Sequence, residues 1–226
     1  MSDISVSLMP LPPRVLLRDH ARTSIRSAIV SGELAPGSVV KDTELAAALG
    51  LSVAPVRAAL ARLVDEGLIE AKPQSHTRVT PCTAKQVHDA GIVLRAMHQL
   101  AVELAVPAMS ADDVKALRTA NVVFANAVAA GNADGALAAD DALHNVLLLR
   151  CGNPAVAATA ERFTPVVLRL ERQRFASPHG LDSVVLHDRL IDACEAGDVA
   201  GAVEVTTHIW TALLSDLSQQ LSNGVV

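Results

Sequence analysis

The sequence predicts a mainly α-helical protein in two parts, a small N-terminal domain with a β-hairpin and a C-terminal antiparallel bundle of about six helices. The first observation is composition: 39 of the 226 residues are alanine, Tyr is absent, and Phe and Trp together number four. An alanine-rich, aromatic-poor chain favours closely packed helices over sheet. The second is the helical spacing of apolar residues in most segments. The third is the short Gly, Pro and Asn breaks between these segments, which imply short loops between antiparallel neighbours.

The composition also excludes several classes of protein. Half of the chain is hydrophobic and 19% is charged, which excludes an intrinsically disordered chain. Apolar runs stay below the ~18 residues that a membrane span needs. Residues 1–13 combine an early acid with several prolines and lack a basic start, which indicates a flexible arm rather than a secretory signal. Three widely spaced cysteines, Cys82, Cys151 and Cys194, argue against a disulfide framework and favour the cytoplasm.

Charge divides unevenly between the two parts. Residues 1–80 hold nine Lys or Arg and eight Asp or Glu, a net charge of +1, whereas residues 81–226 hold ten and sixteen, a net charge of −6. The sum is the −5 of the whole chain. Parts with different charge indicate different partners, and a near-neutral domain still binds DNA if its cations share one face.

The first two predicted helices lie in residues 14–50. Residues 16–31 have helical apolar spacing and stop at Gly32, before a turn rich in Gly, Pro and Ser. Asp42 is a candidate N-cap for a short helix that Gly50 closes. The glycine suits the tight connection between two helices of a DNA-binding motif.

A third helix and a hairpin complete the domain at residue 80. Ser52 caps a helix that runs to Gly67 with one apolar stripe formed by Val56, Leu60, Leu63 and Val64. Two short strands follow, LIEAK and TRVTP, joined by a turn at PQSH. This order of elements predicts a winged helix-turn-helix over residues 14–80.

Residues 83–222 are predicted to be all-helical. The punctuation places six helices, over residues 83–106, 110–130, 134–151, 154–176, 180–196 and 199–222. Their amphipathic pattern and short loops predict an antiparallel bundle.

The winged domain has a set of candidate DNA contacts. A recognition helix enters the major groove through its N-terminal residues, while cations contact phosphates and the wing reaches the minor groove. The candidates are Lys41, Thr43, Ser52, Val53, Ala54, Arg57, Arg62, Thr77 and Arg78. For each arginine alone, a solvated helix face remains an equal alternative.

The bundle contains a candidate metal site. Asp140 and His144 are spaced i,i+4 and so share one helix face, and His187 and His208 lie on two other predicted helices. Three imidazoles and a carboxylate suit Zn, Ni, Mn or Fe. Spacing alone leaves a second interpretation open, in which each histidine is an ordinary core or surface residue, and this is our interpretation of His20, His76, His88, His98 and His179.

Arginines in the acidic bundle are candidates for binding a carboxylate. Arg95 lies in an otherwise apolar stretch, and Arg169, Arg172 and Arg174 cluster on one helix. A buried arginine that faces a cavity binds a carboxylate through two hydrogen bonds. For Arg172 and Arg174 we favour surface salt bridges; for Arg95 both interpretations stay open.

Residues 26–69 resemble the DNA-binding domain of the GntR family of transcription regulators. The resemblance rests on the IVSGEL-x-PGS turn, ELA-x-x-LG, S-x-x-PVR-x-AL and RL-x-x-EGL. The C-terminal part resembles the effector domain of the FadR branch, named FCD, through Asp140-x-x-x-His144, the break at residues 151–154, His187, the break at residues 196–198 and His208. Six effector-domain helices resemble the shorter, VanR-like subgroup.

The resemblance implies a homodimeric repressor or activator that binds a palindromic operator and responds to a small organic acid. It implies that Asp140, His144, His187 and His208 hold a divalent metal, with zinc the first expectation, and that the metal binds the carboxylate of the acid. It further implies effector contacts from Arg95, which matches a ligand-facing arginine, and we expect Asn153 and Arg169 beside it.

The sequence departs from the family pattern at several positions. The family usually has Arg-Thr where this chain has Val53-Ala54, and an arginine where it has Thr43. These departures put the usual operator in doubt and shift readout toward Ser52, thymine methyl groups or DNA shape. The usual wing glycine and an acidic residue at Gln99 are missing. His187 and His208 are 21 residues apart, one fewer than we expect.

Three function classes follow from these observations. The first is a metal-assisted, ligand-responsive DNA-binding regulator without enzymatic activity. The second is an enzyme, because His187-Asp188 is an HD dipeptide in a helical domain, as in metal-dependent phosphohydrolases. The third is a regulator whose metal is only structural.

Overall fold

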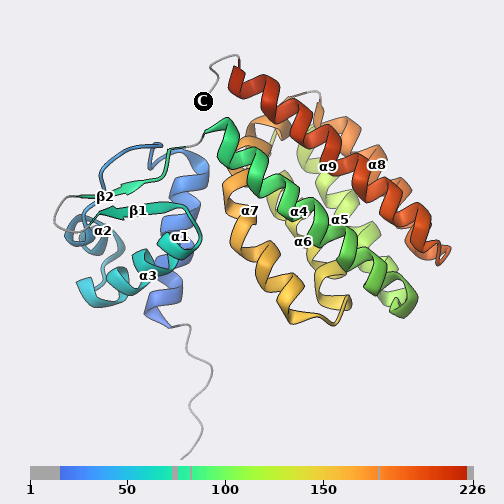
Figure 1. Cartoon of the computed structure of the whole chain (residues 1–226), viewed down its shortest axis with the longest axis horizontal. Coiled ribbons are helices and arrows are strands. Elements are labelled where there is room, and N and C mark those ends of the chain that lie inside the picture. Colours follow the sequence, from blue (N-terminus) through green and yellow to red (C-terminus); the bar gives the residue numbers. More distant parts are fainter. Residues whose placement is uncertain (1–15, 73–75, 82, 178, 223–226) are drawn as a thin grey trace, which may run out of the picture.

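The computed structural model describes residues 16–72, 76–81, 83–177 and 179–222. The arm expected over residues 1–13 lies outside this part. Two lobes lie side by side in Figure 1, a winged helix-turn-helix domain and a larger helical bundle. The mainly α-helical fold predicted from the sequence is confirmed.

The winged domain has three helices and a two-stranded antiparallel sheet. They are α1 (Leu17–Ser31), α2 (Asp42–Leu49), α3 (Val53–Asp65), β1 (Ile69–Lys72) and β2 (His76–Val79). Ile69 pairs with Val79, and residue Val39 adds a bridge to Arg78 on the other edge of β2. Apolar side chains from all three helices and the hairpin form one core, which includes Ile25 and Leu63.

The turn between α2 and α3 depends on Gly50. Its φ of +66° is left-handed, a conformation that glycine adopts without a steric penalty. Two details differ from the expectation. Lys41, not Asp42, is the N-cap of α2, and Ser52 occupies the N-cap of α3 without a side-chain capping bond. Val64 is 38% exposed, because α3 buries Ala59 in its place.

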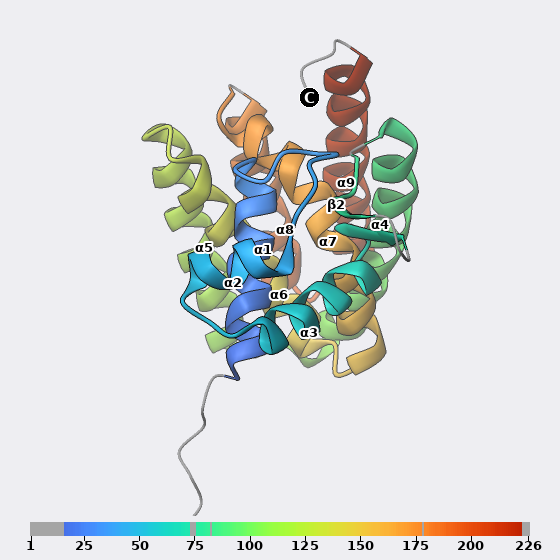
Figure 2. The ribbon, with the colours of Figure 1, turned by 90° about the vertical axis from the view of Figure 1, so that its left-hand side faces the viewer.

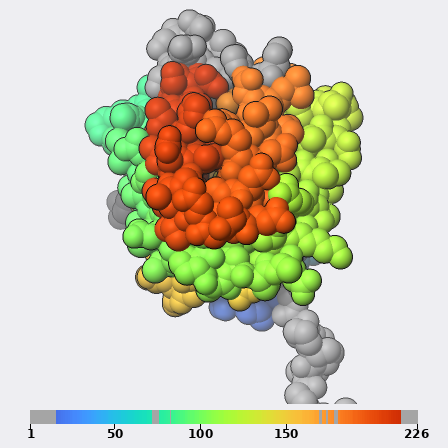
Figure 3. Space-filling view, turned by 90° about the vertical axis from the view of Figure 1, so that its right-hand side faces the viewer, coloured from blue at the N-terminus to red at the C-terminus, as the bar shows by residue number. Residues whose placement is uncertain are grey.

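The bundle has six long helices and one 3-10 turn. They are α4 (Ala84–Ala105), η1 (Val106–Ala108), α5 (Ala111–Ala129), α6 (Ala133–Arg150), α7 (Pro154–Phe175), α8 (His179–Glu195) and α9 (Val199–Ser222). The hydroxyl groups of Thr83 and Ser110 begin α4 and α5 in capping boxes. Figure 3 shows the face remote from the winged domain, where α8 and α9 lie side by side.

Helix α4 is the central element of the bundle. It packs against α6, α7 and α9. Gly91 permits the close approach to α9, because a Cβ at this position would come within 2.1 Å of Leu214 Cδ2. Leu94 and Leu143 are fully buried in the core around it. Side chains on the buried stripe of α4 therefore face the centre of the bundle.

Helix α1 joins the two lobes. It lies between the rest of the winged domain and α7 (Figure 1), and it packs against both α3 and α7. Arg22 donates to Glu66 at 3.1 Å and to Glu161 of α7 at 3.3 Å, and Arg26 donates to Glu66 at 2.9 Å. Val30 packs against an apolar cluster of the bundle. The winged domain and the bundle thus share a charged and an apolar contact.

No single helix among the described residues is long and apolar enough to cross a membrane; only α2 and α3 taken together meet the same length and composition test, and they are bent by 115°.

Candidate functional site

The candidate DNA-binding surface lies on the side of the winged domain that faces away from the bundle. Figure 2 shows α2 and α3 on this side. Most of the predicted contact residues are exposed there, namely Lys41, Thr43, Ser52, Ala54, Arg57 and Arg62. Val53, Thr77 and Arg78 are partly buried, and Val53 packs against the core of its domain. Val53 is thus less available to a base than its exposed neighbours.

Acidic partners already hold two of the cations of this surface. Arg57 Nε lies 2.5 Å from Asp42 Oδ2, and Lys41 Nζ lies 2.6 Å from Glu44 Oε1. The Arg57 guanidinium lowers the pKa of Asp42, and Glu44 raises the pKa of Lys41. Since exposed ion pairs are weak, phosphate groups can replace these carboxylates. The pairing explains how a near-neutral domain presents oriented cations.

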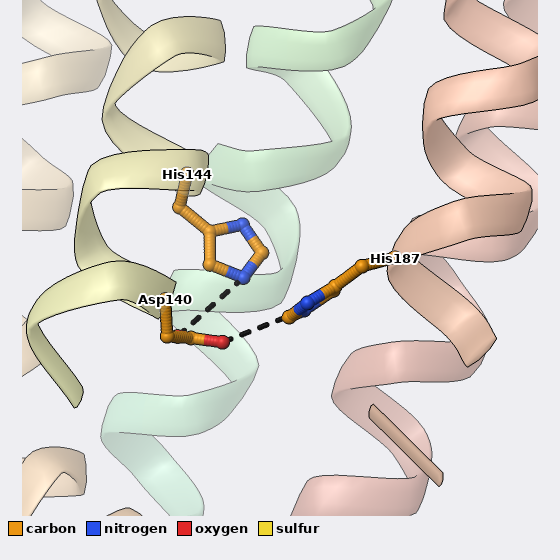
Figure 4. Close-up of side chains that lie close together, drawn as sticks. All are labelled: Asp140, His144 and His187. Carbon is orange, nitrogen blue, oxygen red and sulfur yellow. Dashed lines mark ion pairs between the residues drawn. The ribbon is translucent and has the colours of Figure 1, made fainter. Parts of the chain in front are cut away.

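The candidate metal centre lies inside the bundle, between α6 and α8. Asp140 and His144 come from successive turns of α6, and His187 comes from α8 (Figure 4). Asp140 Oδ1 lies 3.4 Å from His187 Nε2, and Asp140 Oδ2 lies 3.7 Å from His144 Nε2. One ligand atom from each of the three residues lies within 4.8 Å of the other two. The spacing is close to that of neighbouring ligand atoms around one cation, with bonds of about 2.0–2.2 Å.

Burial determines the protonation of this group. It raises the pKa of Asp140 to about 7, with Asp141 adding to the rise and Arg174 opposing it. Burial also lowers the pKa of His144 to about 4 and that of His187 well below its ordinary value. Both imidazoles are therefore neutral near pH 7, as metal ligation requires. A cation here would offset the cost of burying the carboxylate.

Asn121 of α5 fixes the tautomer of His187. Its amide nitrogen donates to Asp188 Oδ1 at 2.7 Å and to the Val184 carbonyl at 3.3 Å, so its oxygen faces His187 Nδ1 at 3.2 Å. His187 then donates from Nδ1 and presents the lone pair of Nε2 toward Asp140. Such outer partners orient metal-ligating histidines. The donor set and its support therefore fit a divalent cation.

The structure separates the two residues of the HD dipeptide. His187 is 1% exposed and faces the centre of the bundle, whereas Asp188 is exposed and accepts the hydrogen bond from Asn121. Asp188 is not part of the group of three, so the dipeptide does not act as a pair of metal ligands.

The structure does not bring His208 to this centre. His208 is exposed on α9, whose buried face includes Ala202, Thr206, Trp210 and Leu213. A position midway between Thr206 and Trp210 points to the opposite side of a helix with 3.6 residues per turn. The expectation that His208 is the third histidine is thus corrected by the rotation of α9 about its own axis.

His98 of α4 lies beside the centre, although its sequence context suggested an ordinary histidine. It is 4% exposed, and its ring centroid is 5.0 Å from that of His144 and 5.0 Å from that of Trp210. One signal in the sequence was available. His98 continues the apolar stripe of Leu94 and Ala101, so it had to face the core.

A cavity of about 1220 Å³ opens next to the metal centre and extends to the winged domain. At one end its lining includes His98, Asp140, His144, Glu171 and Trp210. At the other end its lining includes Ser24, Arg26 and Ser27 of α1. The volume is sufficient for a small organic ligand with water. A ligand in this cavity could therefore contact both domains.

The three residues that were expected to contact the effector lie in different places relative to the cavity. Asn153 lines the cavity and caps α7, with its side chain accepting from Ala155 N at 3.1 Å. Arg95 is partly buried on α4 and is not among the described residues that line the cavity. The side chain of Arg169 lies outside the described part of the chain. Arg95 differs from the expectation because its helix turns Leu94 and His98 inward instead.

Arg174 is a buried cation rather than the surface residue that we expected. It is 4% exposed, donates to Asp216 at 2.8 Å and also donates to Ser183. Its charge lowers the pKa of both Asp140 and Glu171 against their burial. Arg172 forms the expected surface salt bridge, with Asp134 at 2.7 Å.

Two family models match the chain. The model described as bacterial regulatory proteins, gntR family, matches residues 17–79, and the FCD domain model matches residues 93–212. The second match alone spans more than half of the 226 residues. The boundary between the matches agrees with the change from winged domain to bundle.

Two individual relatives are named as transcriptional regulators, and a solved structure shares the fold. The chain is 29% identical to an HTH-type transcriptional regulator in an unstable DNA locus of Streptomyces ambofaciens, over 86% of this chain and 82% of that protein. It is 26% identical to a probable D-xylose utilization operon transcriptional repressor of Paenarthrobacter nicotinovorans, over 94% and 93% of the two chains. The solved structure of E. coli McbR/YncC shares the fold, with a TM-score of 0.81, 20% identity and 92% and 99% coverage.

Proposed function

The chain belongs to the GntR family of bacterial regulatory proteins and its bundle is an FCD domain, and from this premise we propose that it is a repressor released from DNA by a small organic acid. It is a DNA-binding transcription regulator and not an enzyme, which removes the hydrolase alternative. What supports repression is the relative from Paenarthrobacter nicotinovorans, which is named a transcriptional repressor.

The proposed operator complex is a homodimer bound to a palindromic DNA site, and the proposed location of the protein is the cytoplasm. The recognition helix α3 enters the major groove through Ser52 and Ala54, while Lys41 and Arg57 bind phosphate groups. Half-sites about one DNA turn apart, ~34–36 Å, match two such helices related by a two-fold axis. Because Val53 and Thr43 replace the usual arginines, shape and thymine methyl groups carry more of the recognition.

The bundle is proposed to bind its acid through a divalent metal, with zinc the first choice and nickel, manganese or iron the alternatives. Asp140, His144 and His187 would hold the cation. A bound cation would supply a Lewis-acid centre for the carboxylate of the acid. Asn121 keeps His187 in the required tautomer, and the neutral state of both histidines at pH 7 favours binding.

The observation that carries the proposal is the cavity that runs from His144 to α1. An acid in it meets the metal-binding residues at one end and Arg26 of the DNA-binding domain at the other. Arg26 also holds Glu66 at the end of α3. A ligand that draws Arg26 away from Glu66 changes how the winged domain sits against α7 and so changes the spacing of the recognition helices.

The first test is fluorescence anisotropy with the DNA upstream of the chain's own gene, near physiological salt and with excess nonspecific competitor. We expect saturable binding with a Kd of about 10⁻⁸ M or below that survives the competitor. Binding that the competitor removes completely would contradict an operator at this position. Mass photometry of the same complex should show two protein chains per duplex.

The second test separates a regulatory metal from a structural one. Small mono- and dicarboxylic acids are added at about millimolar concentration to DNA complexes of metal-loaded and chelator-treated protein. Release only from the metal-loaded complex supports the proposal. Release from both samples contradicts a metal-bridged acid, and melting on chelation without any acid response assigns the metal a structural role.

A further inference from the structure

We propose that His98 of α4 is the fourth protein ligand of the metal centre, in the place where the sequence pattern suggested His208 of α9. This inference rests on the proposed metal site at Asp140, His144 and His187. It adds a third helix to that site, so that the cation would join α4 to α6 and α8.

The spacing of the imidazole rings supports this assignment. A metal–nitrogen bond of about 2.0–2.1 Å places a ring centroid about 3.2 Å from the cation, so two imidazoles on one cation have centroids about 4.5 to 5.2 Å apart. The centroids of His98 and His144 are 5.0 Å apart, and those of His144 and His187 are 5.5 Å apart. Each of these two neighbouring pairs of rings thus stands near the separation that a shared cation imposes.

His98 has an unsatisfied polar atom. Its Nδ1 is buried and has no hydrogen-bond partner among the described residues. Buried nitrogens are rarely left without a partner, and an absent ion or water is the common explanation. A neutral imidazole carries a free lone pair on one of its two ring nitrogens. That lone pair is available to a cation.

Trp210 of α9 lies beside His98. Its ring centroid is 5.0 Å from that of His98, and the residue lines the cavity, in a place on α9 that faces the centre. Its buried Nε1 also lacks a hydrogen-bond partner in the described part of the chain. An indole N–H is only a donor, so it cannot ligate a cation but can bind an oxygen of the acid. Helix α9 therefore supplies a ligand-binding donor and a support for His98 instead of a metal ligand.

His98 is not itself in the group of three described residues whose ligand atoms lie within 4.8 Å of one another. It lines the same cavity as Asp140 and His144, and its ring contacts that of His144. Ligation of the cation would therefore bring a ring nitrogen of His98 closer to that group than it lies in this structure.

The test uses the full-length protein and cobalt(II), which reports on its own ligands. Trp210 is the single tryptophan and Tyr is absent, so intrinsic fluorescence excited in the tryptophan band comes from a residue in contact with His98. Cobalt binding at the centre should quench it. The titration compares the unaltered chain with His98→Ala, with His208→Ala, and with His88→Ala, an exposed residue on the same helix.

We expect His98→Ala to lower cobalt affinity at least about 10-fold, since even outer-shell losses cost 10–100-fold, and the other two variants to bind like the unaltered chain. Normal affinity of His98→Ala together with a loss in His208→Ala would overturn the inference and leave the metal site intact. Absence of cobalt binding by the unaltered chain would overturn the proposed metal function itself, and the inference with it.

A second variant distinguishes direct ligation from support. In His98→Cys a thiolate takes the position of the imidazole, and thiolate bound to cobalt absorbs strongly in the near ultraviolet. We expect this band in His98→Cys and not in His88→Cys. Circular dichroism of each metal-free variant checks that the helices are retained, so that a lost band cannot be assigned to unfolding. A folded His98→Cys protein that binds cobalt without the band would contradict direct ligation.

Discussion

The winged domain carries its candidate functional side chains on its surface, whereas the helical bundle buries them. The winged domain presents Lys41 and Arg57 on its surface over a small apolar core, whereas the bundle buries Asp140 and His187 among packed helices. A surface residue needs only the right position along its helix. A buried ligand also needs the right rotation of that helix, and burial shifts its pKa. The domains therefore differ in how they respond to substitution, salt and pH.

The largest expected effect of a single substitution lies at the buried site. Asp140→Asn removes the charged ligand, so we expect metal affinity to fall by more than about 100-fold, beyond the loss of an outer-shell residue. The metal-free protein should be no less stable, because a neutral amide avoids the burial cost that raises the Asp140 pKa. A chromophoric chelator in competition measures the affinity, and thermal melting measures the stability.

The matched control is Asp192→Asn, an exposed aspartate on α8. It should leave metal affinity unchanged. Equal losses in both variants would mean that the affinity reflects the net acidity of the bundle rather than a defined site, and the contrast between buried and surface chemistry would fail.

A smaller effect is expected on the surface. Arg57→Ala removes one phosphate contact, so DNA affinity should fall about 10-fold for all sequences. The slope of the logarithm of the binding constant against the logarithm of salt concentration should decrease in size by about one. Metal affinity should not change, since Arg57 lies on the outer side of the winged domain. Lys85→Ala, which removes an exposed cation of α4, is the control. An unchanged salt slope in Arg57→Ala would place the DNA on another face.

The smallest effect is a pH dependence of stability that the surface chemistry does not share. Folding raises the pKa of Asp140 to about 7 and of Glu171 to about 8, above their ordinary values of 3.8 and 4.5. The folded state therefore binds more protons than the unfolded state, and the free energy of unfolding falls as pH rises through these values. The lowered pKa of His144 acts in the opposite direction, but only below about pH 6.5.

For chelator-treated protein we thus expect the free energy of unfolding to fall between pH 6.5 and 8.5 by on the order of 1 kcal/mol. Urea titration at several pH values measures it. Glu171→Gln should flatten the decline, and bound metal should do the same through Asp140. A profile that stays flat over this interval would show that these carboxyl groups ionise in the folded protein as they do in the unfolded chain.

Different parts of the molecule could be predicted from the sequence to different extents. Helix boundaries such as Gly50 and Asn153 follow from local backbone chemistry, so the order of elements in both domains was predictable. Asp140 and His144 share a face because they lie on one helix. The sequence pattern placed His208 at the metal centre and His98 away from it, whereas the structure places them the other way round. The reason is that the rotation of α9 and α4 about their axes depends on packing against other helices. The contact of the cavity with α1 depends on how the two domains pack against each other. Local sequence patterns do not predict that packing.

The most direct test of the account is anomalous diffraction at the zinc edge from crystals of the full-length protein grown with zinc. We expect one strong peak about 2.0–2.2 Å from ligand atoms of Asp140, His144 and His187, in the cavity that reaches α1. A peak at the exposed His208, or an empty cluster in crystals that hold zinc elsewhere, would contradict a buried metal centre in this regulator.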